Sequence, residues 1–427
     1  MHLVLLAGLS CVMVGLPAGA AERGPEPGPA RVQTARPRIG LVLSGGGARG
    51  AAHVGVLKAL EEMHVPIDAI AGTSMGAVVG GLYASGMSAS QIESALGSVD
   101  WQDAFRDRPS RDGLSLRRKR EDRDFLVQLP LGFRDGSFQL PSGLIQGQKL
   151  GQLLRQLTLP VAATVDFDHL PIPFRAVATD LESGGAVIMR DGDLASALRA
   201  SLSAPGIFAP VERNGRLLVD GGISDNVPVD VARAMNVDRL IVVDVGYPLA
   251  QRDELGSVTN VANQMLTILI RRESERQLAT LTGDDVLVRP DLQDASSYNF
   301  TGLKRNMATG EVAAAAVRPQ LQALALPQGD FERHLANRVR QVQVPEIRSV
   351  GVQPDSTAFA AAVETLFGGM VGAPLDSTAL SGEISRFYGQ GLFESLDYRL
   401  EPVGSAEPNA ADLKFSVRPN SWGPTYL

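Results

Sequence analysis

The sequence predicts an α/β fold with a mostly parallel sheet over residues 37 to about 326. Strand-like and helix-like runs alternate through this stretch, and a glycine-rich turn joins the first strand-like run to a helix-like run. The strand-like runs are short and apolar, as expected for parallel strands that helices cover on both faces. These runs lie at residues 39–43, 69–71, 174–179, 217–219 and 240–245.

The glycine-rich turn after the first strand reads "SGGGARG" and has two interpretations. Gly45, Gly47 and Gly50 fit the G-x-G-x-x-G spacing of dinucleotide-binding folds, but such glycines also free backbone N–H groups to hold a substrate oxygen. A dinucleotide site needs an acidic residue at the end of the second strand, whereas Asp68 precedes that strand. The sequence G-K-S/T is absent, which excludes a phosphate-binding P-loop. We therefore interpret the turn as an oxyanion hole.

The second strand runs into "GTSMG", which fits the G-x-S-x-G pattern of a nucleophile elbow. Such an elbow requires a strand before the serine and a helix after it, and both are predicted here. Gly72 and Gly76 remove side chains that would collide in the turn, and the helix N-terminus places partial positive charge beside Ser74. The pattern is short, and an ordinary helix N-cap is the structural alternative for Ser74. Its place one element after the glycine-rich turn favours the elbow.

A serine nucleophile needs a base, and a carboxylate is better placed for this role than a histidine. No histidine after the N-terminal segment lies within a motif. Asp220 ends the fourth predicted strand, so we expect it at the same carboxyl edge of the sheet as Ser74. Asp180, Asp225 and Asp244 are rival carboxylates, and a simple Asp-Gly turn is the structural alternative for Asp220.

The ordered blocks "SGGGARG", "GTSMG", "SAPGIFAP" and "VDGG" resemble the patatin-like phospholipase family over residues 37–330. The resemblance implies a three-layer α/β/α domain that hydrolyses acyl esters of lipids through a Ser–Asp dyad without histidine. The positions that match the family's motifs are Ser74 as nucleophile, Asp220 as base, Gly45, Gly46 and Gly47 as oxyanion-hole donors, Arg49 as support of their loop, and Gly50, Gly72, Gly76, Gly221 and Gly222 in the supporting turns.

The same resemblance implies a carboxylic ester hydrolase of phospholipase A or lysophospholipase type. Its expected partners are a phospholipid or another acyl lipid and the membrane surface that holds it. We expect no cofactor, and the sequence has no metal-ligand spacing. A net charge of −7 and a pI of about 5.4 give no indication of nucleic-acid binding.

The N-terminal end predicts export. Residues 1–21 have an apolar centre and a small-residue end, which is typical of a cleaved signal peptide, and residues 22–36 suit a flexible linker. The usual positive start of a signal is missing, so a true start further upstream and retention as an anchor are alternatives. The single cysteine, Cys11, lies in this segment, so the mature chain would have no thiol.

A second, smaller module is predicted at residues 346–420, after a polar linker at 331–345. Its predicted order β-α-α-β-β resembles a POTRA domain, which implies an α+β fold and contact with a β-barrel or a passenger polypeptide. In the family this suggests, an outer-membrane barrel follows, and residues 421–427 lie where its first strand would begin. The expected location is the bacterial outer membrane, the cell surface or the medium, or the periplasm if no barrel follows. A transport or assembly protein with an idle hydrolase domain is the alternative function.

Two segments are candidates for lipid contact. Arg117, Arg118 and Lys119 in "RRKREDR" suit anionic head groups, although mixed charge usually marks a solvated face. The stretch "PSGLIQGQKLGQLLRQLTLP" predicts a helix whose leucines contact lipid as a lid or face the core, and the second outcome is the commoner one. Its leucines at near-helical spacing are Leu144, Leu150, Leu153, Leu154 and Leu157.

Overall fold

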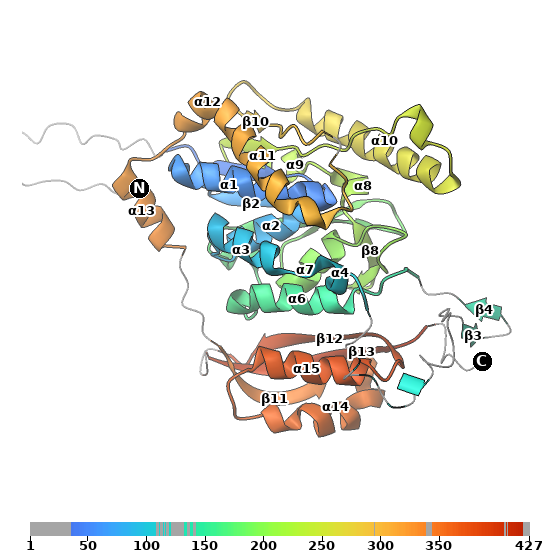
Figure 1. Cartoon of the computed structure of the whole chain (residues 1–427). Coiled ribbons are helices and arrows are strands. Elements are labelled where there is room, and N and C mark those ends of the chain that lie inside the picture. Colours follow the sequence, from blue (N-terminus) through green and yellow to red (C-terminus); the bar gives the residue numbers. More distant parts are fainter. Residues whose placement is uncertain are drawn as a thin grey trace, which may run out of the picture. The chain divides into compact units, whose positions relative to one another are not determined.

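The computed structural model describes residues 36–107, 142–293, 295–338, 344–404 and 409–421, with shorter pieces at 111, 114, 116, 119–120, 132–134, 137–139 and 407 (Figure 1). Residues 37–427 form one compact unit. The predicted signal peptide, almost all of the predicted N-terminal linker and the last six residues lie outside the described residues. So does most of the predicted head-group segment at 117–123.

The larger part of the unit is built on an eight-stranded sheet in the order β10-β9-β1-β2-β5-β8-β7, with β6 also paired to β5. The strands from β10 to β5 pair in parallel, whereas β6, β7 and β8 pair antiparallel. The strands are β1 Ile39–Leu43, β2 Ala69–Thr73, β5 Phe174–Asp180, β6 Ala186–Met189, β7 Val211–Arg213, β8 Arg216–Asp220, β9 Arg239–Val243 and β10 Val286–Val288. The α/β class, the mostly parallel sheet and all five predicted strands are confirmed.

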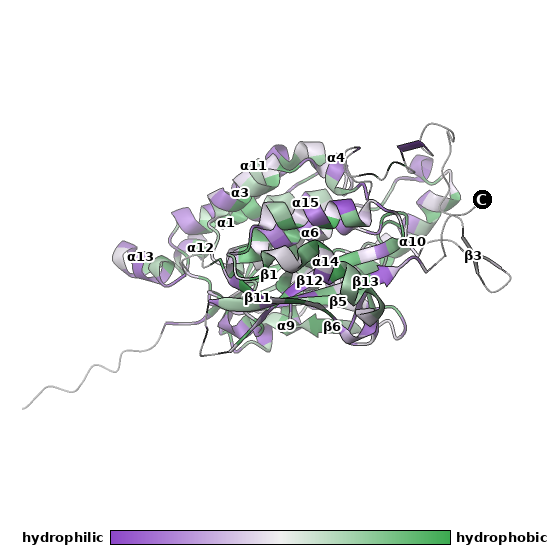
Figure 2. Cartoon of the chain, turned by 90° about the horizontal axis from the view of Figure 1, so that it is seen from below, coloured by the Kyte–Doolittle hydropathy of each residue, from purple (hydrophilic) through white to green (hydrophobic). Residues whose placement is uncertain are grey.

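Helices cover both faces of this sheet. Leu41 and Leu43 of β1 face one core, which they share with α1, α2, α3 and α11, whereas Val42 between them faces a second core with α9. Figure 2 shows α1, α3 and α11 on one side of β1 and β5 and α9 on the other. The α-helices of this part are α1 Ala52–Glu62, α2 Met75–Ala84, α3 Ala89–Ser98, α4 Trp101–Ala104, α6 Gln148–Thr158, α7 Leu194–Ser201, α8 Gly222–Asp225, α9 Val229–Arg233, α10 Val258–Leu278, α11 Leu303–Ala316, α12 Arg318–Gln322 and α13 Gln328–Ala336.

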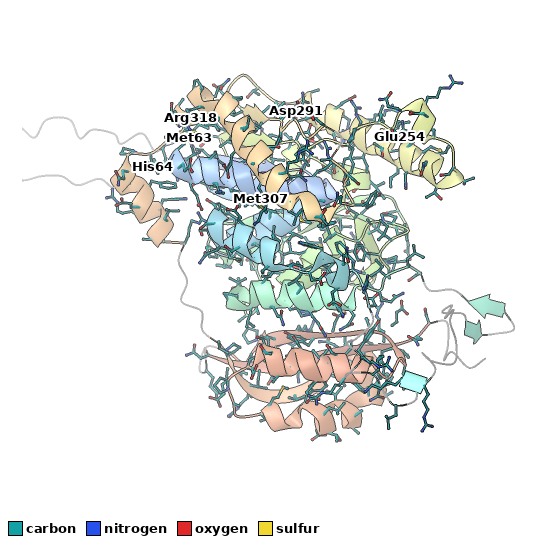
Figure 3. All side chains as sticks on the ribbon, viewed as in Figure 1. Met63, His64, Glu254, Asp291, Met307 and Arg318 are labelled. Carbon is teal, nitrogen blue, oxygen red and sulfur yellow. The ribbon has the colours of Figure 1, made fainter. Side chains whose placement is uncertain are left out.

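The predicted linker at 331–345 is wrong at its start, because α13 continues the larger part of the unit. Phe331 of α13 is buried, and its ring stacks on that of His64 with the ring centroids 5.2 Å apart. His64 is labelled in Figure 3. Beyond the helix, the guanidinium of Arg338 lies over the ring of Tyr83, 3.9 Å from its centroid. The polar composition of this segment predicted a linker. In the structure its first part is a helix that packs through one buried aromatic side chain.

The C-terminal module has the predicted order β-α-α-β-β. It consists of β11 Glu346–Val352, α14 Ala360–Phe367, α15 Ser377–Tyr388, β12 Phe393–Pro402 and β13 Ala410–Pro419. β13 lies in the centre of the sheet, parallel to β11 and antiparallel to β12. Both helices pack on this sheet (Figure 1). The rings of Phe367 and Phe415 stack on each other within the module's own core.

Helix α6 resolves the choice between the two interpretations of its leucines. Leu150 and Leu154 are buried in the main core, and Leu153 and Leu157 pack against that core half-buried. Only Leu144, which precedes the helix, is exposed. The lid interpretation is therefore wrong for this helix, and the core-facing alternative holds.

Within the part of the chain that the structure describes, no helix is both long enough and apolar enough to cross a bilayer.

Candidate active site

The register of β5 explains how Ser74 and Asp220, which are 146 residues apart, come together. β2 runs parallel to β5 and ends at Thr73 opposite Val177. β8 runs antiparallel to β5 and ends at Asp220 opposite Ala178, the next residue along β5. The ends of the two strands therefore meet on consecutive residues of one neighbouring strand.

Ser74 occupies the strained turn between β2 and α2. Its φ of 54° and ψ of −124° lie in a region that non-glycine residues rarely adopt. A side chain at Gly76 would lie 2.3 Å from the carbonyl oxygen of Leu43, so only glycine fits there. The backbone N–H of Ser74 donates to Ser201 Oγ at 2.9 Å, and Ser201 Oγ donates to the carbonyl of Val177 at 2.5 Å. These contacts hold the strained conformation in place.

The hydroxyl of Ser74 is hydrogen-bonded to a carboxylate. Ser74 Oγ donates to Asp220 Oδ2 at 2.6 Å, and the N–H of Gly222 donates to Asp220 Oδ1 at 2.8 Å. The Asp220 backbone is fixed as well, because its N–H donates to the carbonyl of Ser203 and its own carbonyl accepts from Thr179 Oγ1. Burial raises the pKa of Asp220 to about 6, although its two hydrogen bonds oppose that rise.

Two amides of the glycine-rich loop are free to bind a substrate oxygen. Among the described residues, the N–H groups of Gly46 and Gly47 have no hydrogen-bond acceptor. The N–H of Gly45 donates to the carbonyl of Asn226 at 3.1 Å, so the prediction that Gly45 is an oxyanion donor is wrong. The sequence could not show this, because the acceptor is 181 residues away in the chain. Gly47 has a φ of 54°, and a side chain there would lie 2.3 Å from the carbonyl oxygen of Ser297.

Arg49 holds the glycine-rich loop through hydrogen bonds to two other loops. Its buried guanidinium donates to the carbonyls of Val245 and Gly246, at distances between 2.8 and 3.1 Å. It also donates to the carbonyls of Gln293 and Ala295, at 3.3 and 2.8 Å. Arg49 thus ties two separate loops to the start of α1, which is the supporting role the resemblance implied.

The remaining glycines of the predicted set make close backbone contacts. A side chain at Gly50 would meet Met75 at 2.6 Å, and one at Gly72 would meet the carbonyl of Gly76 at 2.7 Å. A side chain at Gly221, the residue after Asp220, would lie 2.3 Å from the carbonyl oxygen of Val177. These positions let the strands and α2 approach closely enough for the site to form.

The rival carboxylates do not contact Ser74 in the described part of the chain. Asp180 accepts from Ser183 Oγ and the N–H of Glu182, and Asp244 accepts from the N–H of Gly246. Asp225 is buried close to Asp230, and burial raises its pKa to about 8. None of these is placed to take a proton from the serine.

No described histidine is hydrogen-bonded to Ser74 either. His53 is fully buried, where its Nε2 donates to the carbonyl of Ser44 at 2.8 Å. Burial lowers the pKa of His53 to about 4, so the ring is neutral at pH 7. His64 and His334 stack on Phe331, and His169 is largely exposed beside Asp166.

Three residues of the site had no signal in the sequence analysis. Ser201 receives the Ser74 N–H, Thr179 fixes the Asp220 carbonyl, and Asn226 receives the Gly45 N–H. Ser201 stands two residues before "SAPGIFAP" and Asn226 six residues after Asp220. Their closeness to known motifs was the only available indication.

The described residues contain no group of three or more His, Cys, Asp or Glu side chains arranged to hold a metal ion. A mostly parallel α/β sheet that presents a strained serine at the start of a helix, beside a carboxylate and free loop amides, is typical of enzymes with a serine nucleophile.

Comparison with known proteins shows which proteins with such a site this chain resembles. Residues 41–233 match the family model described as patatin-like phospholipase. An NTE family protein of Mycobacterium tuberculosis is 37% identical over 253 residues, which are 58% of this chain and 61% of the relative. Patatin-like phospholipase domain-containing protein 6 of Homo sapiens is 33% identical over 219 residues, which are 51% of this chain and 14% of the relative. These similarities support a patatin-like α/β domain in this chain.

The match spans less than two thirds of the length of either relative. Among solved structures, the alignment with VipD from Legionella pneumophila covers 68% of this chain and 68% of VipD at 17% identity, with a TM-score of 0.35. Human GIVD cytosolic phospholipase A2 covers 71% of this chain and 60% of its own at 12% identity, with a TM-score of 0.33.

Proposed function

We propose that the protein is a serine acyl hydrolase of lipids, of phospholipase A or lysophospholipase type, in which Ser74 is the nucleophile and Asp220 is its base. The observation that carries the proposal is the 2.6 Å hydrogen bond from Ser74 Oγ to Asp220 Oδ2. It occurs at a strained turn, next to free amides of the glycine-rich loop.

In the first step, Asp220 Oδ2 takes the proton of Ser74 as Oγ forms a bond to the ester carbonyl carbon. The carbonyl oxygen becomes an oxyanion, which the N–H groups of Gly46 and Gly47 stabilise. The first amides of α2 lie next to Ser74 and add the positive end of the helix dipole. Removal of one such donor typically lowers the rate by about 10²–10³-fold.

In the second step, the tetrahedral intermediate collapses and the bond to the leaving alcohol breaks. The alcohol oxygen takes the proton from Asp220, and the acyl group remains on Ser74. A water molecule then gives a proton to Asp220 and attacks the acyl carbon, and collapse returns that proton to Ser74 Oγ. The fatty acid leaves, and both side chains are restored.

The raised pKa of Asp220 suits this chemistry. A carboxylate with a pKa near 4 is a poor base for a serine hydroxyl, whereas one with a pKa of about 6 binds the proton more strongly and is still ionised at pH 7. Burial of the carboxyl group raises its basicity, and the Gly222 N–H keeps it oriented.

A lipid surface is the partner that this function requires, and α10 is the described element best suited to meet it. Residues 258–270 of α10 contain no charged side chain, and Arg271 and Arg272 follow directly, where they suit anionic head groups. The helix packs on α8, directly after Asp220, so lipid bound at α10 would lie close to the dyad. Its exposed large apolar side chains are Val258, Val261, Met265, Ile268 and Leu269.

Export through a signal peptide at 1–21 and a POTRA-like role for residues 346–420 belong to the same proposal. The β-α-α-β-β order of the module supports the second part. Contact of this module with a β-barrel or a passenger polypeptide, and a location at the cell envelope or outside the cell, follow from it as proposals.

The test is hydrolysis of a phospholipid with two different acyl chains in vesicles, followed by mass spectrometry of the products. We expect release of one free fatty acid and a lysophospholipid by the wild type, and none by Ser74→Ala. Equal rates for the two proteins, with both folded by circular dichroism, would refute the proposed mechanism.

A further inference from the structure

Asn226 joins three parts of the site. It follows α8, is 1% exposed, and accepts the N–H of Gly45 through its backbone carbonyl at 3.1 Å. Its side-chain Nδ2 donates to Ser274 Oγ of α10 at 3.3 Å. One residue thus connects the glycine-rich loop, the segment after Asp220, and α10.

The side-chain oxygen of Asn226 faces the reacting groups without a partner. Oδ1 is buried, and no described donor reaches it. A methyl group built on Gly45 would lie 2.5 Å from Asn226 Oδ1 and 3.3 Å from Ser74 Cβ. One built on Gly222 would lie 3.2 Å from Asn226 Oδ1 and 3.1 Å from Asp220 Oδ1. Oδ1 therefore sits between the glycine-rich loop and the Asp220 turn.

The orientation of this amide is set by Ser274. The Ser274 hydroxyl donates its only proton to the carbonyl of Ile270, at 2.9 Å, so its oxygen can only accept a hydrogen bond from the Asn226 side chain. Nδ2 must point to α10, and Oδ1 must point to Gly45. A buried carbonyl oxygen without a donor is unfavourable by about 1–3 kcal/mol, so its retention needs a reason.

We infer that Asn226 is a positioning residue for the reaction, and this inference rests on the proposed function. Its backbone carbonyl accepts the Gly45 N–H and its side-chain oxygen lies against the Gly45 Cα, and these two atoms set the direction in which the next two amides, of Gly46 and Gly47, point. The side chain acts through Gly45 and does not touch the substrate. An apolar group in its place would leave Gly45 held by the backbone hydrogen bond alone, and a charged group would place charge beside Asp220.

The expected effects follow from this geometry. Asn226→Ala removes the side-chain contact with Gly45 and lowers kcat by about 10²-fold, which is the typical effect of a 1 Å misplacement, while KM stays within about threefold. Asn226→Asp keeps the shape and adds a like charge near Asp220, which raises the pKa of Asp220. The acid limb of the pH–rate profile then moves to higher pH. Ser274→Ala frees the amide from α10 and gives a smaller loss of kcat.

The experiment measures kcat, KM and the pH profile on a soluble fluorogenic short-chain ester, so that membrane binding plays no part. Asn263→Ala, at an exposed position of α10, is the matched control and should keep wild-type kinetics. Wild-type activity no higher than that of Ser74→Ala would refute the proposed function itself. With an active wild type, kcat within threefold of it in folded Asn226→Ala overturns the inference.

An unshifted acid limb in Asn226→Asp would show that position 226 does not lie beside Asp220, which contradicts the geometry behind the inference, and would equally overturn it. If thermal melting shows that Asn226→Ala and Asn226→Asp are both unfolded, Ser274→Ala decides the matter. An unchanged kcat in Ser274→Ala would then refute the positioning role, and a lowered kcat at unchanged melting temperature would support it.

Discussion

Replacement of the buried carboxylate, Asp220→Asn, should separate activity from stability. The amide keeps the shape of the side chain and can still accept from Ser74 Oγ, but it cannot take a proton at neutral pH. General-base catalysis typically contributes about 10²–10⁴-fold, so we expect kcat to fall by that factor. The amides of Gly46 and Gly47 remain in place, so some residual rate should persist.

The same substitution should stabilise the protein at neutral pH. The pKa of Asp220 is raised from its ordinary value of 3.8 to about 6 in the folded protein, mainly because burial disfavours the charged form. At about 1.4 kcal/mol for each pH unit, ionisation of the folded carboxyl is unfavourable by about 3 kcal/mol relative to the unfolded chain. The wild type therefore loses this stability as pH rises from about 4 to about 6, and the loss is complete above that range.

The difference in melting temperature between Asp220→Asn and the wild type is the measurement that checks this. At about pH 3, below both pKa values, the carboxyl is largely neutral in the folded and in the unfolded chain, and the two proteins should melt within about a degree of each other. At pH 7.5 the variant should melt about 6–12 °C higher, since the difference is about 3 kcal/mol and each kcal/mol is worth about 2–4 °C in domains of 150–250 residues. A difference that does not change with pH would refute the reasoning that Asp220 is held ionised against burial.

Three further predictions concern the same site and its surroundings. The value of kcat/KM for a soluble ester should rise with pH through about 6, because only ionised Asp220 acts as base, and an acid limb near pH 4 would contradict this. Gly47→Ala should lower kcat at least 100-fold and destabilise the fold by about 1–3 kcal/mol in urea unfolding, because the residue has a positive φ and its added methyl group would collide with Ser297. The control Gly97→Ala meets no neighbour and should leave the stability unchanged or raise it. Met265→Glu should lower the rate on anionic vesicles about tenfold without affecting the soluble ester. Thr259→Glu, at an exposed polar position of the same helix, is its control, and a shift from dimer to monomer in Met265→Glu would show instead that α10 binds a second copy.

The sequence predicted those parts of the site that depend on local patterns. The elbow at Ser74 and the glycine-rich loop each lie within a few residues, and the spacing of their glycines is dictated by backbone contacts that the structure contains. The strand ahead of Asp220 was predicted from its apolar run, but its antiparallel pairing with β5 was not, because nothing in that run states a direction.

The parts that were missed depend on contacts between distant segments. Ser201 is 127 residues from Ser74, whose N–H it accepts, and Asp225 is 152 residues from Thr73, whose hydroxyl its carbonyl accepts. A serine or an asparagine in a loop has no periodicity to mark it. The same reason explains why Gly45 was assigned a free N–H, since its acceptor lies on another loop.

The site also explains why a serine can be paired with a carboxylate without an intervening histidine. In a Ser-His-Asp triad the acid orients a mobile imidazole ring, which then reaches the serine. Here the carboxyl group is carried on a short side chain at the end of β8, and β5 sets the distance from β8 to the end of β2 through backbone register. The N–H of Gly222 fixes the carboxyl rotation, so no third side chain is needed for orientation. In the proposed mechanism, burial of the carboxylate supplies the basicity that a histidine would contribute. Replacement of Asp220 should therefore lower the activity of this protein and raise its stability at neutral pH.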